Sequence, residues 1–307
     1  MKKVVRYKVI CPLHNFKIRK GSFDKSGIPD KKAKATSQEQ HRQLVEGIEL
    51  QEGVRVRLIS KEDIEDLPDG FISPMRIHPA YRRISHGTFT LEVHVTCKDV
   101  ADMPDVKLAE TLGNIVLAMR LLKRGYVSFS YIFFILTGKK RQLTTWLLEP
   151  RALSRLTLGF RKYTLTFDEI HHLRETIKKV QRIDFKKRRS LHLACRRFQY
   201  AYEKEDLEEK LIDFMIAFET LFMKGERTRA QYGMIIAIAC STLLGKNEEE
   251  REKIRSFLSK AYSIRNKIVH GQEFSEPIII RGKQYDLPLL VLIIEDHLRD
   301  SIKRLLD

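Results

Sequence analysis

The sequence predicts an α+β domain over residues 1–150 followed by an all-α helical bundle over residues 151–307. Two patterns support this division. Short runs in the first half alternate apolar with polar residues, whereas longer runs in the second half repeat apolar residues at helical spacing. A chain of 307 residues also has the length of about two domains, and its 43% of hydrophobic residues can supply a core for each.

Three short runs in the first half are typical of half-buried strands. They read "KVVRYKVI" at 3–10, "VRVRLIS" at 54–60 and "GTFTLEVHVT" at 87–96. Between the first two runs, residues 22–40 are polar, rich in lysine and interrupted by Gly27 and Pro29. This composition indicates an exposed loop.

One helix stands out in the first half, over residues 106–125. Its apolar residues fall at helical spacing, and they are Leu108, Leu112, Ile115, Val116, Met119 and Leu122. Gly125 ends the pattern before an apolar strand at 126–136. No motif with a recognisable chemistry is present in this half, so its role is left open.

The second half predicts five helices. They cover residues 165–183, 205–225, 227–245, 249–270 and the segment that follows Asp286. Residues 227–245 are apolar on most sides, which predicts a central helix buried by its neighbours. Asp286 and Pro288 are typical of the first positions of a helix, and glutamates gather at the start of 249–270, where the helix dipole favours them.

The charge of the chain favours a polyanionic partner. It carries 57 Lys plus Arg against 40 Asp plus Glu, which gives a net charge of +17 and a pI near 9.7. Nucleic acid and an acidic membrane surface both fit this balance. Residues 178–197 form the most basic run, and its centre, Lys186, Lys187, Arg188 and Arg189, is the candidate contact for an RNA backbone. A merely solvated basic face is the alternative.

Membrane and metal functions are disfavoured. No apolar run approaches the roughly 18 residues of a membrane helix, and the apolar start is interrupted by Arg6 and Lys8, which indicates a strand rather than a signal peptide. We therefore expect a soluble, cytoplasmic protein. The four cysteines have no CxxC spacing, so the sequence indicates neither a zinc site nor a disulfide framework, and we expect no metal and no cofactor.

Arg265 occupies an unusual position on the predicted helix at 249–270. It follows Leu258 by seven residues and Ala261 by four, which places it along the apolar side. A buried guanidinium stays charged and needs an anion beside it. Glu219, at the edge of the apolar stripe of its own helix, is the internal candidate, and the phosphate of a ligand is the other.

His270 ends the same helix. It lies roughly 140° around the axis from Arg265, and Gly271 behind it is a typical helix end. A ligand could approach this histidine where the chain leaves the helix. Capping of the helix C-terminus by a histidine explains the same pattern without any function.

The segment "RNKIVHG" resembles the R-x4-6-H motif of the higher eukaryotes and prokaryotes nucleotide-binding (HEPN) superfamily, in which a polar residue such as Asn266 follows the arginine. The surrounding segments are also similar in order to those of the ApeA-like branch of that superfamily. They are "LIDFMIAFETLF" at 211–222, Arg229 before an apolar helix, and "AYSIRNKIVHG" at 261–271. The resemblance covers roughly residues 160–305.

The resemblance implies a HEPN-type bundle of mainly antiparallel helices that dimerises, with the motifs of two protomers facing one cleft. Many members are metal-independent endoribonucleases. Carried onto this chain, Arg265 and His270 are the catalytic pair, Asn266 positions the substrate, and Glu219 and Arg229 support them. The predicted function is RNA cleavage by a homodimer, as a toxin or defence effector, with residues 1–150 contacting an activating or regulatory partner.

The residue types suit that chemistry. Cleavage of RNA without a metal needs a base for the 2′-hydroxyl, an acid for the leaving oxygen and positive charge at the phosphorus. Histidine can exchange a proton near neutral pH, and arginine presents paired donors to phosphate. Two alternatives stay open. The chain is either a non-catalytic HEPN-fold module that binds RNA or nucleotide, or a helical scaffold whose charge serves solubility.

Overall fold

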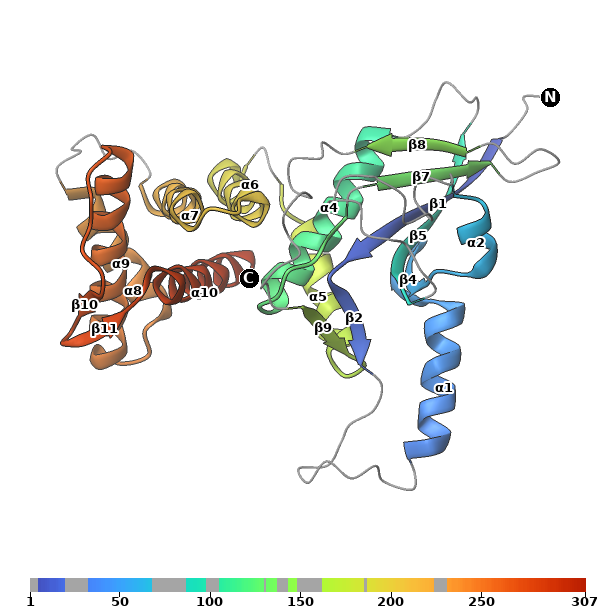
Figure 1. Ribbon diagram of the computed structural model, residues 1–307, viewed down its shortest axis with the longest axis horizontal. Helices are drawn as coiled ribbons and strands as arrows, with labels where there is room; N and C mark the ends of the chain where they lie inside the picture. The colour runs from blue at the N-terminus through green and yellow to red at the C-terminus, as the bar shows by residue number, and fades with distance from the viewer. Residues whose placement is uncertain are drawn as a thin grey trace. The chain divides into compact units, whose positions relative to one another are not determined.

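The structure is a computed structural model that describes residues 5–19, 33–67, 87–97, 105–129, 131–136, 143–147, 162–184, 187–223 and 231–307. The chain divides into two compact units, Met1–Gln181 and Arg182–Asp307. The first is an α+β unit and the second is mainly helical (Figure 1). The division therefore follows Gln181, whereas the sequence pattern placed the second domain at 151–307.

The N-terminal unit is built on an antiparallel sheet with the strand order β3-β4-β5-β1-β7-β8. In chain order these strands are β1 (Val5–His14), β3 (Ile48–Gln51), β4 (Val54–Leu58), β5 (Phe89–Cys97), β7 (Tyr131–Leu136) and β8 (Leu143–Leu147). The short strand β6 (Ser128–Phe129) pairs with the end of β1. Strand β7 is buried on both faces from Tyr131 to Ile135, which places the sheet at the centre of the core.

Residues 162–181 join this unit through contacts distant in the sequence. Strand β9 (Tyr163–Thr166) pairs in parallel with β2 (Phe16–Arg19), and α5 (Glu169–Gln181) packs against α4 (Asp105–Leu122) and β3. Gly125 permits the approach of β9, because its φ is +141° and a Cβ there would lie 2.9 Å from the Tyr163 Cα. These contacts are the physical reason that the unit extends beyond residue 150.

The predicted strands at the start of the chain are confirmed as β1, β4 and β5, and the helix predicted at 106–125 is α4. The apolar stretch 126–136 contains two strands, β6 and β7, rather than one. The loop predicted at 22–40 is wrong in its second part, because residues from Ala33 onward form α1 (Ala33–Glu46). Its sequence contains alanine, glutamine and glutamate, which favour helix, and no glycine or proline. Residues 22–32 lie outside the described part of the chain.

The C-terminal unit contains two helical hairpins and a long final helix. Its elements are α6 (Arg189–Glu203), α7 (Leu207–Phe222), α8 (Tyr232–Leu244), α9 (Glu248–Val269), β10 (Ile278–Ile280), β11 (Lys283–Tyr285) and α10 (Leu287–Leu306). In Figure 1, α6 and α7 are seen almost end-on, whereas α8 and α9 run along the page, so the two hairpins cross. As predicted, Asp286 caps α10, accepting from the Leu289 N–H, and Pro288 lies in its first turn.

The central helix of this unit is α10, which contacts each of the four helices before it. The prediction that the apolar helix at 227–245 is buried by its neighbours is wrong. Met234 and Ile238 of α8 are 62% and 44% exposed, since only the side of α8 that carries Ile236, Ala237 and Cys240 faces the other helices. Among the described helices, none has both the length and the apolar character needed to cross a membrane.

A network of hydrogen bonds and an ion pair links α6 to α10. The Tyr202 hydroxyl donates to Glu295 Oε1 at 2.6 Å, and Arg299 donates to both residues. Arg299 is only 3% exposed, so its guanidinium is held by these contacts inside the unit. Nearby Lys210 is buried as well, and this burial lowers the pKa of its ammonium group to about 8.

Candidate functional site

Helix α9 carries the candidate site at its C-terminal end. Its start is capped by Asn247, whose side chain accepts from the Glu250 N–H. At the other end Gly271 adopts a φ of +65°, its N–H donates to the Ile268 carbonyl, and the Gln272 N–H donates to the Lys267 carbonyl at 2.8 Å. This is a Schellman ending, in which His270 is the C-cap residue that follows Val269. The left-handed backbone explains the glycine at 271.

Arg265 lies beside the buried stripe of α9 and reaches α7. The stripe consists of Ile254, Leu258, Ala261 and Ile264. The Arg265 Nη2 lies 3.3 Å from Glu219 Oε1, with the two side chains 19% and 24% exposed. Of the two anions that could pair with this arginine, the structure therefore contains the internal carboxylate. The pair is half-buried and its edge reaches the surface.

Two neighbours on α9 also hold the guanidinium. Arg265 Nη1 donates to Asn266 Oδ1 at 3.0 Å, and the guanidinium carbon lies 5.6 Å from the centre of the Tyr262 ring. The buried Arg265 Nε has no hydrogen-bond partner within the described residues. The contacts with Glu219 and Asn266 hold the guanidinium between α7 and α9.

Helices α7, α8 and α9 meet at Tyr262. Burial and the negative charge of Glu219 raise the pKa of the Tyr262 phenol above its ordinary value. A Cβ at Gly233 of α8 would lie 2.7 Å from the Tyr262 Cδ1. A side chain at position 233 would therefore require the Tyr262 ring, whose centre lies 5.6 Å from the Arg265 guanidinium carbon, to shift.

His270 is placed differently from the other candidates. Its side chain is exposed and has no partner within the part of the chain that the structure describes. It lies about 7.5 Å farther along the helix axis than Arg265 and roughly 140° around it. The structure thus brings Arg265, Asn266 and Glu219 into contact and leaves His270 at the surface. Arg229 falls outside the described residues.

The candidate RNA-backbone residues lie before and at the start of α6. Lys187, Arg188 and Arg189 are exposed, and Lys187 pairs only loosely with Asp184, with Nζ to Oδ2 at 3.7 Å. Lys186 falls outside the described residues. Helices α6 and α7 run antiparallel, as the Arg197–Asp213 ion pair at 3.1 Å reflects. The start of α6 therefore lies at the same end of this hairpin as Glu219.

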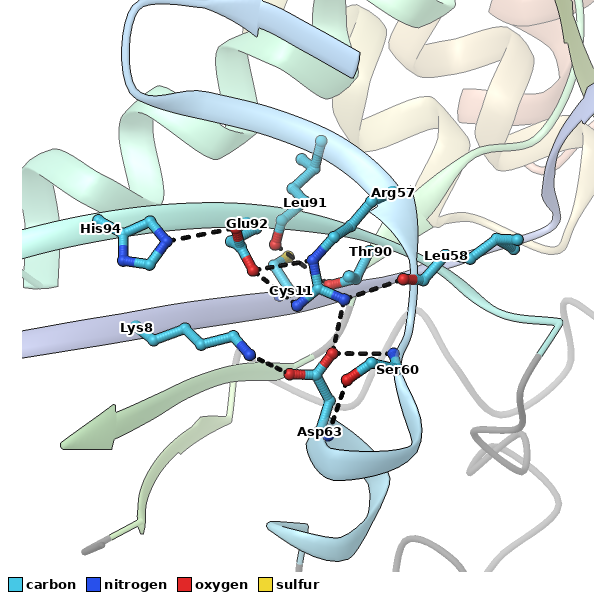
Figure 2. Close-up of polar contacts among 10 residues, drawn as sticks. All are labelled: Lys8, Cys11, Arg57, Leu58, Ser60, Asp63, Thr90, Leu91, Glu92 and His94. Carbon is cyan, nitrogen blue, oxygen red and sulfur yellow. Dashed lines mark hydrogen bonds and ion pairs between the residues drawn. The ribbon is translucent and has the colours of Figure 1, made fainter. Parts of the chain in front are cut away.

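A second polar cluster, absent from the sequence predictions, lies in the N-terminal unit (Figure 2). Asp63 has no exposed surface, and its carboxylate contacts Lys8 of β1 and Arg57 Nη1 of β4, the latter at 2.6 Å. Arg57 also donates to Glu92 Oε2 of β5 through Nε at 2.8 Å and Nη2 at 2.6 Å. Asp63 and Ser60 complete a capping box at the start of α2 (Lys61–Glu65).

Opposite charges balance within this cluster. Burial alone would raise the pKa of Asp63, but hydrogen bonds from Arg57, Lys8 and the Ser60 N–H hold it well below its usual range. Because each buried carboxylate is bound by a cation, the arrangement fits a structural role better than a catalytic one. The signal in the sequence is a capping pattern, Ser60-x-x-Asp63, after a strand with a charged residue at an inward position.

The Arg265–Glu219 pair predicts a moderate effect on stability. Arg265→Ala is expected to lower the free energy of unfolding by about 1–2 kcal/mol, between the values of exposed and buried ion pairs. Lys253→Ala is the matched control, because Lys253 pairs with Glu249 on the same helix at 2.7 Å and 54% exposure. Its removal is expected to cost less than about 0.5 kcal/mol. Chemical denaturation measures both, and an unchanged Arg265→Ala value would mean that Glu219 does not bind the guanidinium in solution.

The described residues contain no group of three or more His, Cys, Asp or Glu side chains placed to hold a metal ion. The chemistry available at the end of α9 is that of a histidine, a guanidinium and an amide. Such a set can bind a phosphate and move a proton. No protein-family model matches the chain, and comparison with curated proteins and with solved structures gives no match.

Proposed function

We propose that this protein is a metal-independent endoribonuclease whose active site is the C-terminal end of α9. One observation carries the proposal. The Arg265 guanidinium is anchored by Glu219 and Asn266, and one turn farther His270 is exposed and unpaired within the described residues. A histidine that only caps a helix needs no anchored arginine in the preceding turn. The resemblance of "RNKIVHG" to the HEPN motif supports the same assignment.

The proposed roles follow from the contacts. Glu219 holds one edge of the guanidinium, and the remaining Nη protons of Arg265 are available to a phosphate oxygen at the surface. Asn266 orients the guanidinium through its Oδ1 and leaves its amide N–H₂ for the substrate. His270 transfers the proton, either from the 2′-hydroxyl or to the leaving 5′-oxygen.

A homodimer completes the proposed site. Each chain offers one histidine in this motif, whereas a concerted cleavage uses a base and an acid. The exposed stripe of α8, Met234 and Ile238, begins next to Gly233, which contacts Tyr262 beside Arg265. An apolar stripe at this place suits a second copy of the chain, whose own α9 end would then face the first.

The dimer has its own test. Met234→Asp with Ile238→Asp is expected to convert a dimer into a monomer in analytical ultracentrifugation at micromolar concentration, because a carboxylate would be desolvated in the interface. RNA cleavage should fall with the dimer. Ser259→Asp places a single carboxylate on the exposed side of α9 and should leave the dimer intact. A wild-type protein that sediments as a monomer while cutting RNA would refute the shared site.

The experiment that tests the function is incubation of the purified wild-type protein with a mixed RNA pool in EDTA. We expect fragments that end in 2′,3′-cyclic phosphate, since attack by the 2′-hydroxyl forms that ring. Fragments that appear only when a divalent cation is added would contradict the metal-independent mechanism. Fragments with 3′-hydroxyl ends would contradict the role of the 2′-hydroxyl.

The second candidate function is a non-catalytic module that binds RNA or nucleotide. The pairing of Arg265 with Glu219 favours it, because a guanidinium engaged by a carboxylate is explained without any substrate. Binding that weakens with salt and gives no product in the same assay would establish this alternative.

A further inference from the structure

The outward side of α6 carries a narrow strip of basic and apolar residues. At 100° per residue, Arg189, Leu193, Arg196 and Tyr200 fall within about 60° of one another. All four are exposed, and we refer to them as the α6 strip. The opposite side of the helix, with Leu191, Ala194, Cys195 and Phe198, is buried, and α6 packs against α7 and α10. The α6 strip is therefore a free surface of the C-terminal unit.

The most distinctive residue of the α6 strip is Tyr200, which is 37% exposed. Arg196 Nη2 donates to its hydroxyl at 2.8 Å, and the guanidinium carbons of Arg196 and Arg197 lie 5.7 and 5.9 Å from the centre of its ring. Arg197 is partly neutralised by Asp213. An accessible aromatic ring held next to guanidinium groups is the combination that binds a base by stacking and the adjoining phosphate by charge.

The distribution of charged residues defines how far the basic surface of the α6 strip extends. The sequence contains no Asp or Glu between Asp184 and Glu203, and neither Arg189 nor Arg196 is paired with a carboxylate among the described residues. Beyond Tyr200 the chain turns acidic, with Glu203, Glu205, Asp206, Glu208 and Glu209. A polyanion is thus attracted to the stretch from Arg189 to Tyr200, about 16 Å long, and repelled beyond it.

We propose that the α6 strip binds single-stranded RNA, with a base stacked on Tyr200 and phosphates at Arg196 and Arg189. A duplex would hide the face of the base from the ring, and an anionic membrane would engage the arginines without needing the ring. The start of α6 lies at the same end of the hairpin as Glu219, so an RNA strand bound along α6 would extend toward Arg265. This last point rests on the proposed function.

The test uses fluorescence anisotropy with a labelled 2′-O-methyl oligouridine, which offers no 2′-hydroxyl for cleavage. Tyr200→Ala is expected to weaken binding about tenfold, whereas Tyr200→Phe, which keeps the ring, should stay within about twofold of the wild type. Arg189→Ala with Arg196→Ala should reduce the slope of log Kd against log salt by about 0.7 for each lost phosphate contact. Arg304→Ala removes one positive charge from the exposed side of α10 and is the control for the loss of a single arginine.

Three outcomes would overturn the proposal: Tyr200→Ala that binds as well as the wild type, a wild type with no affinity for the single strand, or binding to phosphatidylserine vesicles in place of RNA. The cleavage assay separates this proposal from the proposed nuclease function. Tyr200-dependent binding without any cleavage would support RNA binding by the α6 strip and refute the proposed nuclease function. Cleavage and binding that both survive the α6 substitutions would refute the α6 strip alone.

Discussion

His270→Ala is expected to lower the rate of RNA cleavage at least about 100-fold, the usual contribution of a general acid or base. The melting temperature should stay the same, because the side chain is exposed and forms no hydrogen bond or ion pair with the other described residues. The cap of α9 survives the change, since His270 contributes to it through its backbone N–H. Activity and stability are therefore separable at this position, which is what a residue of the reacting centre should show.

Lys267→Ala is the matched control for this prediction. Lys267 is exposed in the same last turn of α9 and offers a positive charge but no group that exchanges protons near neutral pH. We expect its loss to raise the RNA concentration at half-maximal rate and to leave the maximal rate within about threefold. A His270→Ala protein that still cuts at the wild-type rate would remove this histidine from the mechanism, whatever the Lys267 variant does.

Local spacing predicted those elements whose core contacts come from one continuous stripe or one alternating run. Strands β1, β4 and β5 and helices α4, α7, α9 and α10 are of this kind. The boundary at Gln181 was not predictable in this way, because it depends on the pairing of β9 with β2. These two strands are separated in the sequence by more than half the length of the N-terminal unit. The exposure of one side of α8 was not predictable either. Its residues are apolar on most sides, so the sequence does not indicate which side the neighbouring helices leave exposed.

The candidate site was predictable to the same extent. A helical wheel placed Arg265 beside the core and gave Glu219 as the internal candidate for its partner, and the two form an ion pair. The cluster around Asp63 was hidden, because a charged residue in an alternating strand is normally taken to face solvent. Arg57 and Glu92 are instead buried, and their opposite charges pair with each other. The two residues lie on different strands, so no local sequence pattern predicts this ion pair.

Asp63→Ala is expected to lower the free energy of unfolding of the N-terminal unit by about 3–5 kcal/mol. The substitution leaves the Arg57 guanidinium, 7% exposed, with Glu92 alone, and it also removes the capping box of α2. Glu65→Ala on the same short helix is the matched control. Glu65 is 63% exposed and pairs with Lys61 at 3.7 Å, so its loss should cost less than about 0.5 kcal/mol. Denaturation followed by circular dichroism measures both values.

The dependence of this loss on pH distinguishes charge from packing. The folded protein holds the pKa of Asp63 below the value of about 3.9 that aspartate has in an unfolded chain. Its ionic contribution is therefore fully present above about pH 5 and disappears as the pH falls toward the folded pKa. The difference between wild type and Asp63→Ala should accordingly shrink between pH 5 and pH 2. A difference that stays constant over this range would mean that Asp63 stabilises β1, β4 and α2 through packing and the helix cap rather than through its charge.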